Sequence, residues 1–498
     1  MKTPCAPLKC ETGIEGLDDI LCGGFPRNRI YLVQGDPGVG KTTLALQFLL
    51  EGKRNGEVVL YITLSETMEE IQAVAHSHGW SLEGLSIFEL SAMEQHFTRN
   101  AQNTLFHPAD IELNKTTQTL LDHIERLKPR RVVLDSLSEL RLLSETPLRY
   151  RRQILAFKHF FSGRDCTVLF LDDRSGAGDA DLQVQSLAHG VLTLEKKNPE
   201  YGAQRRRVRV DKLRGVKFVE GDHDYSIETG GIAIYPRLVA AEHQKDFPSE
   251  PISSDIKELD MLLGGGLDRG TSTLIMGPAG AGKSIICFQH AIAAAKRGEK
   301  SLFYAFDETL KTILHRMNVL GIPVEKYIKS GHIKLQQIDP ADLPPGEFAH
   351  RIKQGVTNDP DIKLVFLDSL NGYLQAMPDE KFLSLQLHEL LTYLGQQGIV
   401  SIVTLAQHGL VGAMQSPVDV TYLSDTVILL RYFEASGRVK KAISVIKKRS
   451  GYHEDTIREF KIDNTGLRVG EPLTDFHGVL SGLPTFSGKA DTMLKERQ

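Results

Sequence analysis

Two glycine-rich stretches have the residue types and the spacing of phosphate-binding loops. The first runs from Gly35 to Thr42 (GDPGVGKT) and the second from Gly277 to Ser284 (GPAGAGKS). Each follows an apolar β-type run and opens into a helical pattern, the context in which the motif G-x-x-x-x-G-K-[ST] binds phosphates. The glycines let consecutive backbone N–H groups turn inward, and the following helix points its positive end at the phosphates. Because the chance of two such matches is well below about one in a thousand, we predict two nucleotide-binding sites.

The residues of each loop have individual expected roles, with ATP and Mg²⁺ as the cofactors. The lysine would reach the β- and γ-phosphates, and the hydroxyl group after it would hold Mg²⁺. The predicted nucleotide-binding residues are Gly38, Gly40, Lys41, Thr42 and Thr43 in the first loop and Gly280, Gly282, Lys283, Ser284 and Ile285 in the second.

An aspartate ends a later apolar strand pattern in each half of the chain. Asp135 follows Arg131 to Leu134, and Asp368 follows Leu364 to Leu367. With a phosphate loop upstream, an acid at this place is expected to orient Mg²⁺ and its water; the alternative is a simple strand cap. We predict that these two aspartates share the metal with the loop hydroxyls.

Carboxylates after another strand are candidates for handling the attacking water. Glu66 holds this place in the first half, and Asp307 and Glu308 hold it in the second. One strand away from the loop, such groups could orient or deprotonate water, whereas the alternative is a solvated face. Ser65 stands where the second half has Asp307. We therefore expect the halves to hydrolyse at different rates, with the first slower.

Basic residues recur late in each half. Lys212 and Arg214, like Lys447 and Arg449, are alternate residues of a predicted strand, so each pair shares one face and could grip a phosphate. Their place beyond the core sheet suits action on the nucleotide of a neighbouring subunit, as arginine fingers do in trans. The run Arg205 to Arg207 is interpreted as an exposed cationic hairpin.

The two halves are related by an internal repeat. Asp18 and Asp260, Lys41 and Lys283, and Glu66 and Glu308 are each 242 positions apart. The constant offset means that no net insertion separates the copies over this stretch.

Strand and helix patterns alternate in both copies, which predicts an α/β fold. Each copy should form a mainly parallel sheet flanked by helices, with a terminal antiparallel hairpin and with ligands at the carboxyl ends of the strands. We predict domains at residues 1–240 and 241–498, with a proline-containing linker over 236–251. The polar tail after Ser481 is expected to be mobile.

The composition restricts the class of protein. With 498 residues, of which 41% are hydrophobic and 24% charged, the chain is long enough for two or three buried domains. A net charge of −4 gives no overall attraction to nucleic acid or anionic membranes. No apolar run approaches the roughly 18 residues of a membrane span, and no secretory signal opens the chain. Five scattered cysteines without metal-ligand spacing indicate free thiols, so we expect a cytoplasmic protein.

These motifs together resemble the KaiC family of cyanobacterial clock ATPases. The lead-ins Leu17 to Gly24 and Leu259 to Gly265, and the segments Ser424 to Tyr432 and Ile457 to Phe460, are also similar to it. The similarity covers about Thr12 to Ser481. It implies two tandem RecA-like P-loop domains, a homo-hexameric ring with ATP at subunit interfaces, slow hydrolysis and serine/threonine autophosphorylation in the C-terminal domain. It also implies a KaiB-like or signalling-protein partner and catalytic roles for Glu66, Asp307 and Glu308, with nucleotide contacts from the neighbour through Lys212, Arg214, Lys447 and Arg449.

The chain departs from the family pattern at three places. Ser65 and Glu66 keep one glutamate of the pair in the first domain. Thr421 and Tyr422 align with the phosphorylated serine–threonine pair, so Thr421 is the candidate phosphosite. The tail from 481 to 498 is shorter than the one that receives an activating partner, so a KaiA-like partner is not expected.

Besides a regulatory timer or switch, the motifs are compatible with two other functions. One is a RecA-like DNA-directed motor or recombinase, favoured by the clusters at 205–209, 440–441 and 447–449 and opposed by the acidic balance. The other is a scaffold that binds ATP mainly to assemble, favoured by Ser65.

Overall fold

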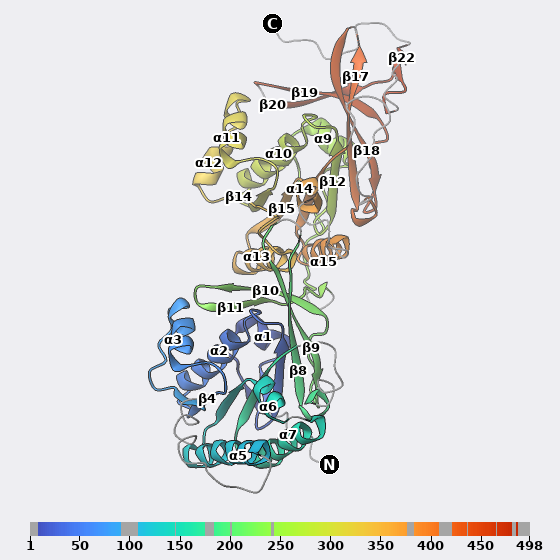
Figure 1. Cartoon of the computed structure of the whole chain (residues 1–498). Helices are drawn as coiled ribbons and strands as arrows, with labels where there is room; N and C mark the ends of the chain where they lie inside the picture. The colour runs from blue at the N-terminus through green and yellow to red at the C-terminus, as the bar shows by residue number, and fades with distance from the viewer. Residues whose placement is uncertain are drawn as a thin grey trace, which may run out of the picture. The chain divides into compact units, whose positions relative to one another are not determined.

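The computed structural model describes residues 8–90, 108–144, 146–174, 184–199, 202–240, 244–375, 383–407, 421–435, 437–464, 466–480 and 485–486. The chain divides into two compact units (Figure 1). The N-terminal unit comprises Met1–Glu200 and Gln204–Arg237, and the C-terminal unit comprises Tyr201–Ala203 and Leu238–Gln498.

The N-terminal unit contains a nine-stranded sheet with the order β11-β10-β9-β8-β3-β7-β6-β4-β5. The neighbouring strands from β8 to β5 in this order are parallel: β3 (Ile30–Gly35), β4 (Val59–Thr63), β5 (Ser86–Glu89), β6 (Arg131–Asp135), β7 (Thr167–Asp173) and β8 (Gly190–Lys197). An antiparallel extension follows: β9 (Arg205–Leu213), β10 (Asp222–Glu228) and β11 (Gly231–Tyr235). A separate two-stranded antiparallel sheet, formed by β1 (Lys9–Cys10) and β2 (Phe25–Pro26), precedes β3 in the sequence.

Helices cover both faces of this sheet. The helices are α1 (Glu15–Ile20), α2 (Lys41–Arg54), α3 (Met68–Ser77), α5 (Pro108–Leu127), α6 (Leu137–Leu143) and α7 (Pro147–Phe161). Alternate strand residues divide between two cores, because successive side chains of a strand point to opposite faces. On β3, Tyr31 and Val33 pack with α1 and α2, while Leu32 packs with α6 and α7. Strand β3 is therefore buried along its whole length.

The C-terminal unit repeats the same order, β20-β19-β18-β17-β12-β16-β15-β13-β14 when read from its antiparallel edge. Its strands are β12 (Ser272–Gly277), β13 (Lys300–Ala305), β14 (Ile333–Gln337), β15 (Ile362–Asp368), β16 (Val400–Ala406), β17 (Thr426–Ala435), β18 (Arg438–Lys448), β19 (Ile457–Asp463) and β20 (Gly466–Pro472), with a short pair β21 (Phe476–His477) and β22 (Thr485–Phe486). Its helices are α9 (Lys257–Leu262), α10 (Lys283–Lys296), α11 (Leu310–Val319), α12 (Val324–Lys329), α13 (Pro345–Asn358), α14 (Leu370–Gln375) and α15 (Leu383–Gln396). The predicted α/β fold of two mainly parallel sheets is confirmed.

Local signals start several helices. Thr67 and Glu70 form a reciprocal capping box at the start of α3. Thr309 caps α11 through the backbone N–H of Thr312. Glu66 and Glu308 stand in the turns between β4 and α3 and between β13 and α11, so the caps fix the turns that hold these two carboxylates.

The structure extends the sequence interpretation at the antiparallel edge. Each sheet continues beyond the predicted hairpin by two more strands, β10 and β11 in one unit and β19 and β20 in the other. The run Arg205 to Arg207 lies on β9, between β8 and β10. The predicted hairpin is present, because β8 and β9 pair antiparallel, but the predicted exposure is wrong: Arg205 is buried and the next two arginines are half-buried.

The predictions about the cysteines and about membrane spans can be compared with the structure over the described residues. Cys10, Cys22, Cys166 and Cys287 are free thiols, and Cys5 lies outside the described residues. Within the described ranges, every helix is too short or too polar to cross a membrane. Most of the predicted tail, including 487–498, lies outside the described residues.

Candidate nucleotide-binding sites

Each glycine-rich loop joins the carboxyl end of the central strand to a long helix. The first connects β3 to α2 and the second connects β12 to α10. Gly40 and Gly282 stand just before the helices with φ of 96° and 113°. A Cβ atom would come within 2.7 Å of the Ile227 side chain at the first position and 2.5 Å of Ile462 at the second. Glycine is therefore required at both positions by the backbone angle and by the space.

The two loop lysines are buried and make equivalent contacts. The Nζ atom of Lys41 donates to the carbonyl oxygens of Gly35 at 2.9 Å and Asp36 at 3.0 Å. Lys283 donates to Gly277 at 3.0 Å and to Pro278 at 2.9 Å. Burial lowers the pKa of Lys283. Each loop thus folds around its own ammonium group, next to the N-terminus of the following helix.

The predicted metal-site residues come together in both units. Thr42 Oγ1 donates to Asp135 Oδ2 at 3.2 Å, and the Ser284 hydroxyl group is hydrogen-bonded to Asp368. Burial raises the pKa of both aspartates, and the hydroxyl donors act in the opposite direction. A hydroxyl and a buried carboxylate side by side are suited to Mg²⁺, which takes one or two protein ligands and completes its shell with water and phosphate oxygens. Among the described residues, three or more His, Cys, Asp or Glu side chains never gather as a metal site of their own.

Each strand-end aspartate has a further donor that differs between the units. Tyr61 on β4 donates its hydroxyl to Asp135 Oδ2 at 2.5 Å, whereas the matching residue of β13 is Phe303. Thr404 on β16 donates to Asp368 Oδ1 at 2.5 Å, whereas the matching residue of β7 is Leu171. The strand registers establish both matches. The sequence analysis missed these donors, because neither lies in a motif.

The surroundings of Glu66 suit a general base that works near neutral pH. It is half-buried, and its Oε2 atom has no hydrogen-bond partner among the described residues. Burial, followed by the charges of Asp135, Glu70 and Asp173, raises the pKa of Glu66 to about 7, while Lys41 acts to lower it. This carboxyl group can therefore take up and release a proton near pH 7.

The carboxylate pair of the C-terminal unit is held by neighbouring side chains. Asp307 is exposed and accepts a hydrogen bond from the Ser369 hydroxyl. Glu308 Oε1 forms an ion pair with Arg316 Nη1 at 2.6 Å. Val74 takes the place of Arg316 in the N-terminal unit, at the same spacing after the glutamate. The two candidate bases therefore differ in their partners.

Asp173 is a site residue that the sequence analysis did not identify. Asp173 is the last residue of β7, and it forms an ion pair with Lys41, at 2.6 Å between Asp173 Oδ1 and Nζ. The sequence does contain a signal for this site residue, because two acids, Asp172 and Asp173, directly follow the apolar residues of the strand.

The late basic residues lie at the other end of each sheet. Lys212 Nζ donates to the Gln185 carbonyl at 2.6 Å, and Arg214 donates to Ser186 at 2.8 Å. Lys447 Nζ donates to Thr421 O at 2.8 Å and to Ser424 O at 2.7 Å, and Arg449 donates to Tyr422 O at 3.1 Å. Both pairs are thus held on backbone carbonyls, away from the loops of their own unit.

Some cations of two described basic clusters are paired with acids. Arg207 pairs with Asp224 at 3.2 Å, Arg209 with Asp211 at 2.6 Å, and Lys440 with Glu459 at 3.2 Å. Paired cations offer little attraction to a nucleic-acid backbone.

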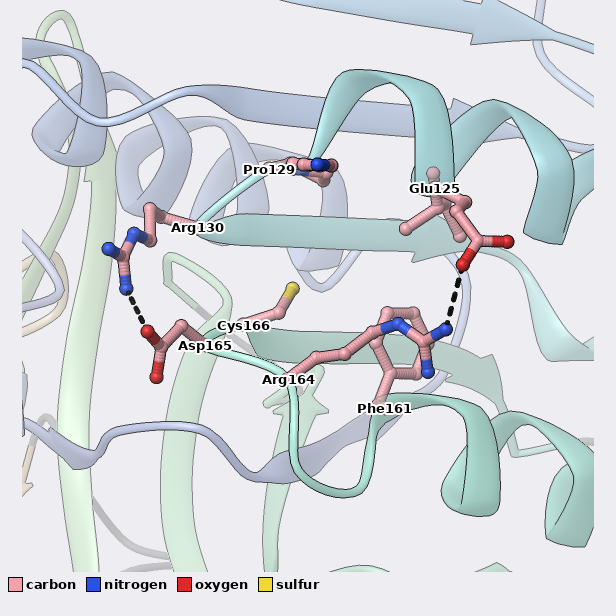
Figure 2. A pocket seen from close by; sticks show the side chains of 9 residues that line it. Glu125, Pro129, Arg130, Phe161, Arg164, Asp165 and Cys166 are labelled. Atoms are coloured by element: carbon pink, nitrogen blue, oxygen red, sulfur yellow. Dashed lines mark hydrogen bonds and ion pairs between the residues drawn. The ribbon is translucent and has the colours of Figure 1, made fainter.

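A hollow of about 340 Å³ lies at the amino ends of β6 and β7, opposite the phosphate loop. Figure 2 shows Cys166 between two ion pairs, Arg130–Asp165 at 2.9 Å and Arg164–Glu125 at 3.2 Å. Burial raises the pKa of the Cys166 thiol to about 12, so this sulfur is unreactive near neutral pH. The hollow is separate from the nucleotide site.

Comparison with known proteins agrees with the motif geometry in both units. The model of the KaiC ATPase family matches residues 10–239 and again residues 252–474. The circadian clock oscillator protein KaiC of Picosynechococcus sp. is 26% identical over 96% of this chain and 92% of its own length. The circadian clock protein KaiC3 of Synechocystis sp. is 26% identical over 97% and 96%, and KaiC of Synechococcus elongatus is 26% identical over 96% and 92%. The chain belongs to the KaiC ATPase family.

Proposed function

We propose that the chain is a Mg²⁺-dependent ATPase that forms a homo-hexameric ring and phosphorylates itself on Thr421, acting as a regulatory timer or switch. Its working domains are residues 1–240 and 241–498. The observation that carries the proposal is the separation of each phosphate loop from the Lys-x-Arg pair of the same unit.

The separation follows from strand register. Leu213 pairs with Gly190, and Gly190 pairs with Tyr31 near the amino end of β3. Lys448 likewise pairs with Thr426, and Thr426 with Thr273 near the amino end of β12. Each central strand has six residues, about 20 Å, and the phosphate loop follows its carboxyl end. A basic pair at the amino end is therefore well placed for the nucleotide of another subunit.

The same geometry supports phosphorylation between subunits. Thr421 begins a 3₁₀ turn (Thr421–Leu423) just before β17, at the amino end of the sheet. The loop with Lys283 lies at the carboxyl end. The Thr421 hydroxyl would thus receive phosphate from the site of a neighbour, next to that neighbour's Asp307 and Glu308.

The residues of each unit would have separate roles in hydrolysis. Lys41 or Lys283 would hold the phosphates, and Thr42 with Asp135, or Ser284 with Asp368, would hold Mg²⁺, which neutralises charge on the phosphates. Glu66 or Glu308 would accept the proton of the attacking water.

Incubation of the full chain with Mg²⁺ and γ-labelled ATP tests both activities. Released phosphate and protein-bound label are counted separately. We expect both, with bound label lost in Thr421→Ala and kept in Tyr422→Phe. Label that persists in Thr421→Ala would remove the phosphosite assignment alone, and a lack of released phosphate would refute the ATPase itself.

Hydrolysis at the N-terminal site should depend on pH through Glu66. Since the pKa of Glu66 is raised to about 7, the carboxyl group is protonated below that pH and cannot accept a proton. In a Lys283→Ala background, kcat/KM should therefore rise about tenfold between pH 6 and pH 8. The rise should vanish in Glu66→Gln. A profile that is flat across pH 7 would contradict the role of Glu66 as the base.

A further inference from the structure

The two nucleotide sites differ at one position beside the loop lysine. Strand β7 pairs with β3 so that Asp173 stands next to Gly35, the first loop residue. Strand β16 pairs with β12 in the same register, and there Ala406 stands next to Gly277. The two positions are equivalent, so one site has a carboxylate where the other has a methyl group.

The Asp173 side chain is held against Lys41. Its Oδ1 lies 2.6 Å from Nζ, and its backbone N–H donates to Ser138 Oγ at 3.2 Å. Ser138 Oγ is also 3.5 Å from Asp173 Oδ2. The end of β7 is thus fixed from both sides, and the carboxylate points at the cation.

In the C-terminal site a polar side chain also holds the end of the equivalent strand, β16, but that strand ends without a carboxylate. Asn371 of α14 holds the backbone of Ala406, accepting from its N–H at 2.6 Å and donating to its carbonyl at 2.9 Å. Among the described residues, Lys283 forms no ion pair within 4.0 Å and bonds only to loop carbonyls. Its charge remains available to a phosphate.

We propose that Asp173 selectively lowers the affinity of the N-terminal site for ATP, so that the two sites fill at different ATP concentrations. The inference rests on the proposed function. A phosphate that approaches Lys41 competes with a carboxylate for the same ammonium group and meets its negative charge at close range. The C-terminal site lacks the competing ion pair, although the charges of Asp368 and Asp307 also act on Lys283.

The effect should be larger for ATP than for ADP. The loop lysine reaches the β- and γ-phosphates, and the γ-phosphate adds negative charge next to Asp173. The N-terminal site would therefore respond to the ratio of ATP to ADP, while the C-terminal site stays loaded. A role of Asp173 as an extra base would instead lower hydrolysis on its removal and leave affinity unchanged.

Calorimetric titration of the full chain with Mg-ATP and Mg-ADP tests the inference. In a Lys283→Ala background, only the N-terminal site binds. Asp173→Ala and the isosteric Asp173→Asn should each tighten ATP about tenfold, the scale of one charge-assisted hydrogen bond, and ADP less. The mirror change, Ala406→Asp in a Lys41→Ala background, should weaken ATP by a similar factor.

Three outcomes would overturn the inference: unchanged ATP affinity in both Asp173 variants, weaker affinity in both, or equal gains for ATP and ADP. Each would leave the ATPase proposal standing, provided that the parent binds ATP. A parent that binds no nucleotide at either site would refute the proposed function as well. Matching thermal melting curves of parent and variants exclude a folding defect.

Discussion

Replacing both Glu66 and Glu308 by glutamine should lower phosphate release from ATP by a factor of about 10²–10⁴, the usual contribution of a positioned base, while ATP remains bound. The amide keeps the size of each side chain and removes its ability to accept a proton. Glu66→Gln alone and Glu308→Gln alone should each lose only the phosphate release that comes from the altered domain. Steady-state phosphate release and calorimetric ATP binding on the same preparations separate the two effects.

A matched control is available one turn further along the chain. Glu69 stands on the exposed side of α3, in its first turn, so Glu69→Gln removes a carboxylate near Glu66 without touching the site. Its rate should equal that of the parent. If Glu66→Gln with Glu308→Gln released phosphate as fast as the parent, another group would have to handle the water.

Arg131→Ala should destabilise the N-terminal unit by about 3–5 kcal/mol, because it removes one partner of a buried ion pair. Arg131 is 1% exposed. Its guanidinium bonds to Glu57 Oε2 at 2.5 Å and to the carbonyls of Glu11 at 2.7 Å and Phe48 at 2.8 Å. The truncation would leave two carbonyls without their donor, and Glu57 with the more distant and more exposed Arg27, at 3.4 Å. Denaturant unfolding followed by circular dichroism measures the loss.

The adjacent residue provides the control for this variant. Arg130 pairs with Asp165 at 2.9 Å, but their side chains are 51% and 69% exposed. Such pairs contribute about 0–1 kcal/mol, so Arg130→Ala should cost far less than Arg131→Ala. Equal losses in the two variants would show that burial does not determine the contribution of these arginines.

Local motifs made much of the fold predictable. The loops around Lys41 and Lys283 and the acids that end their strands are short signals, and the constant spacing of the repeat placed them in equivalent strands. Asp173 could not be recognised in this way. Its contact with Lys41 depends on the length of β7 and on its register against β3, which nearby residues do not encode.

The misread arginines have a similar explanation. A run such as Arg205 to Arg207 is typical of a solvated surface, and only the presence of β10 beyond β9 brings acids such as Asp224 against it. The strands β10 and β19 carry mixed polar and apolar residues without a clear alternation, so periodicity alone did not predict them.

The exchange of hydroxyl donors around Asp135 and Asp368 also constrains how the repeat can evolve. Since duplication, one copy has come to use a tyrosine and a leucine where the other uses a phenylalanine and a threonine. Losing Tyr61 without gaining a hydroxyl at Leu171 would take one hydroxyl donor from Asp135 and leave that of Thr42. An exchange of sequence between the halves would therefore keep the number of hydroxyl donors on each aspartate only if it transferred both positions together.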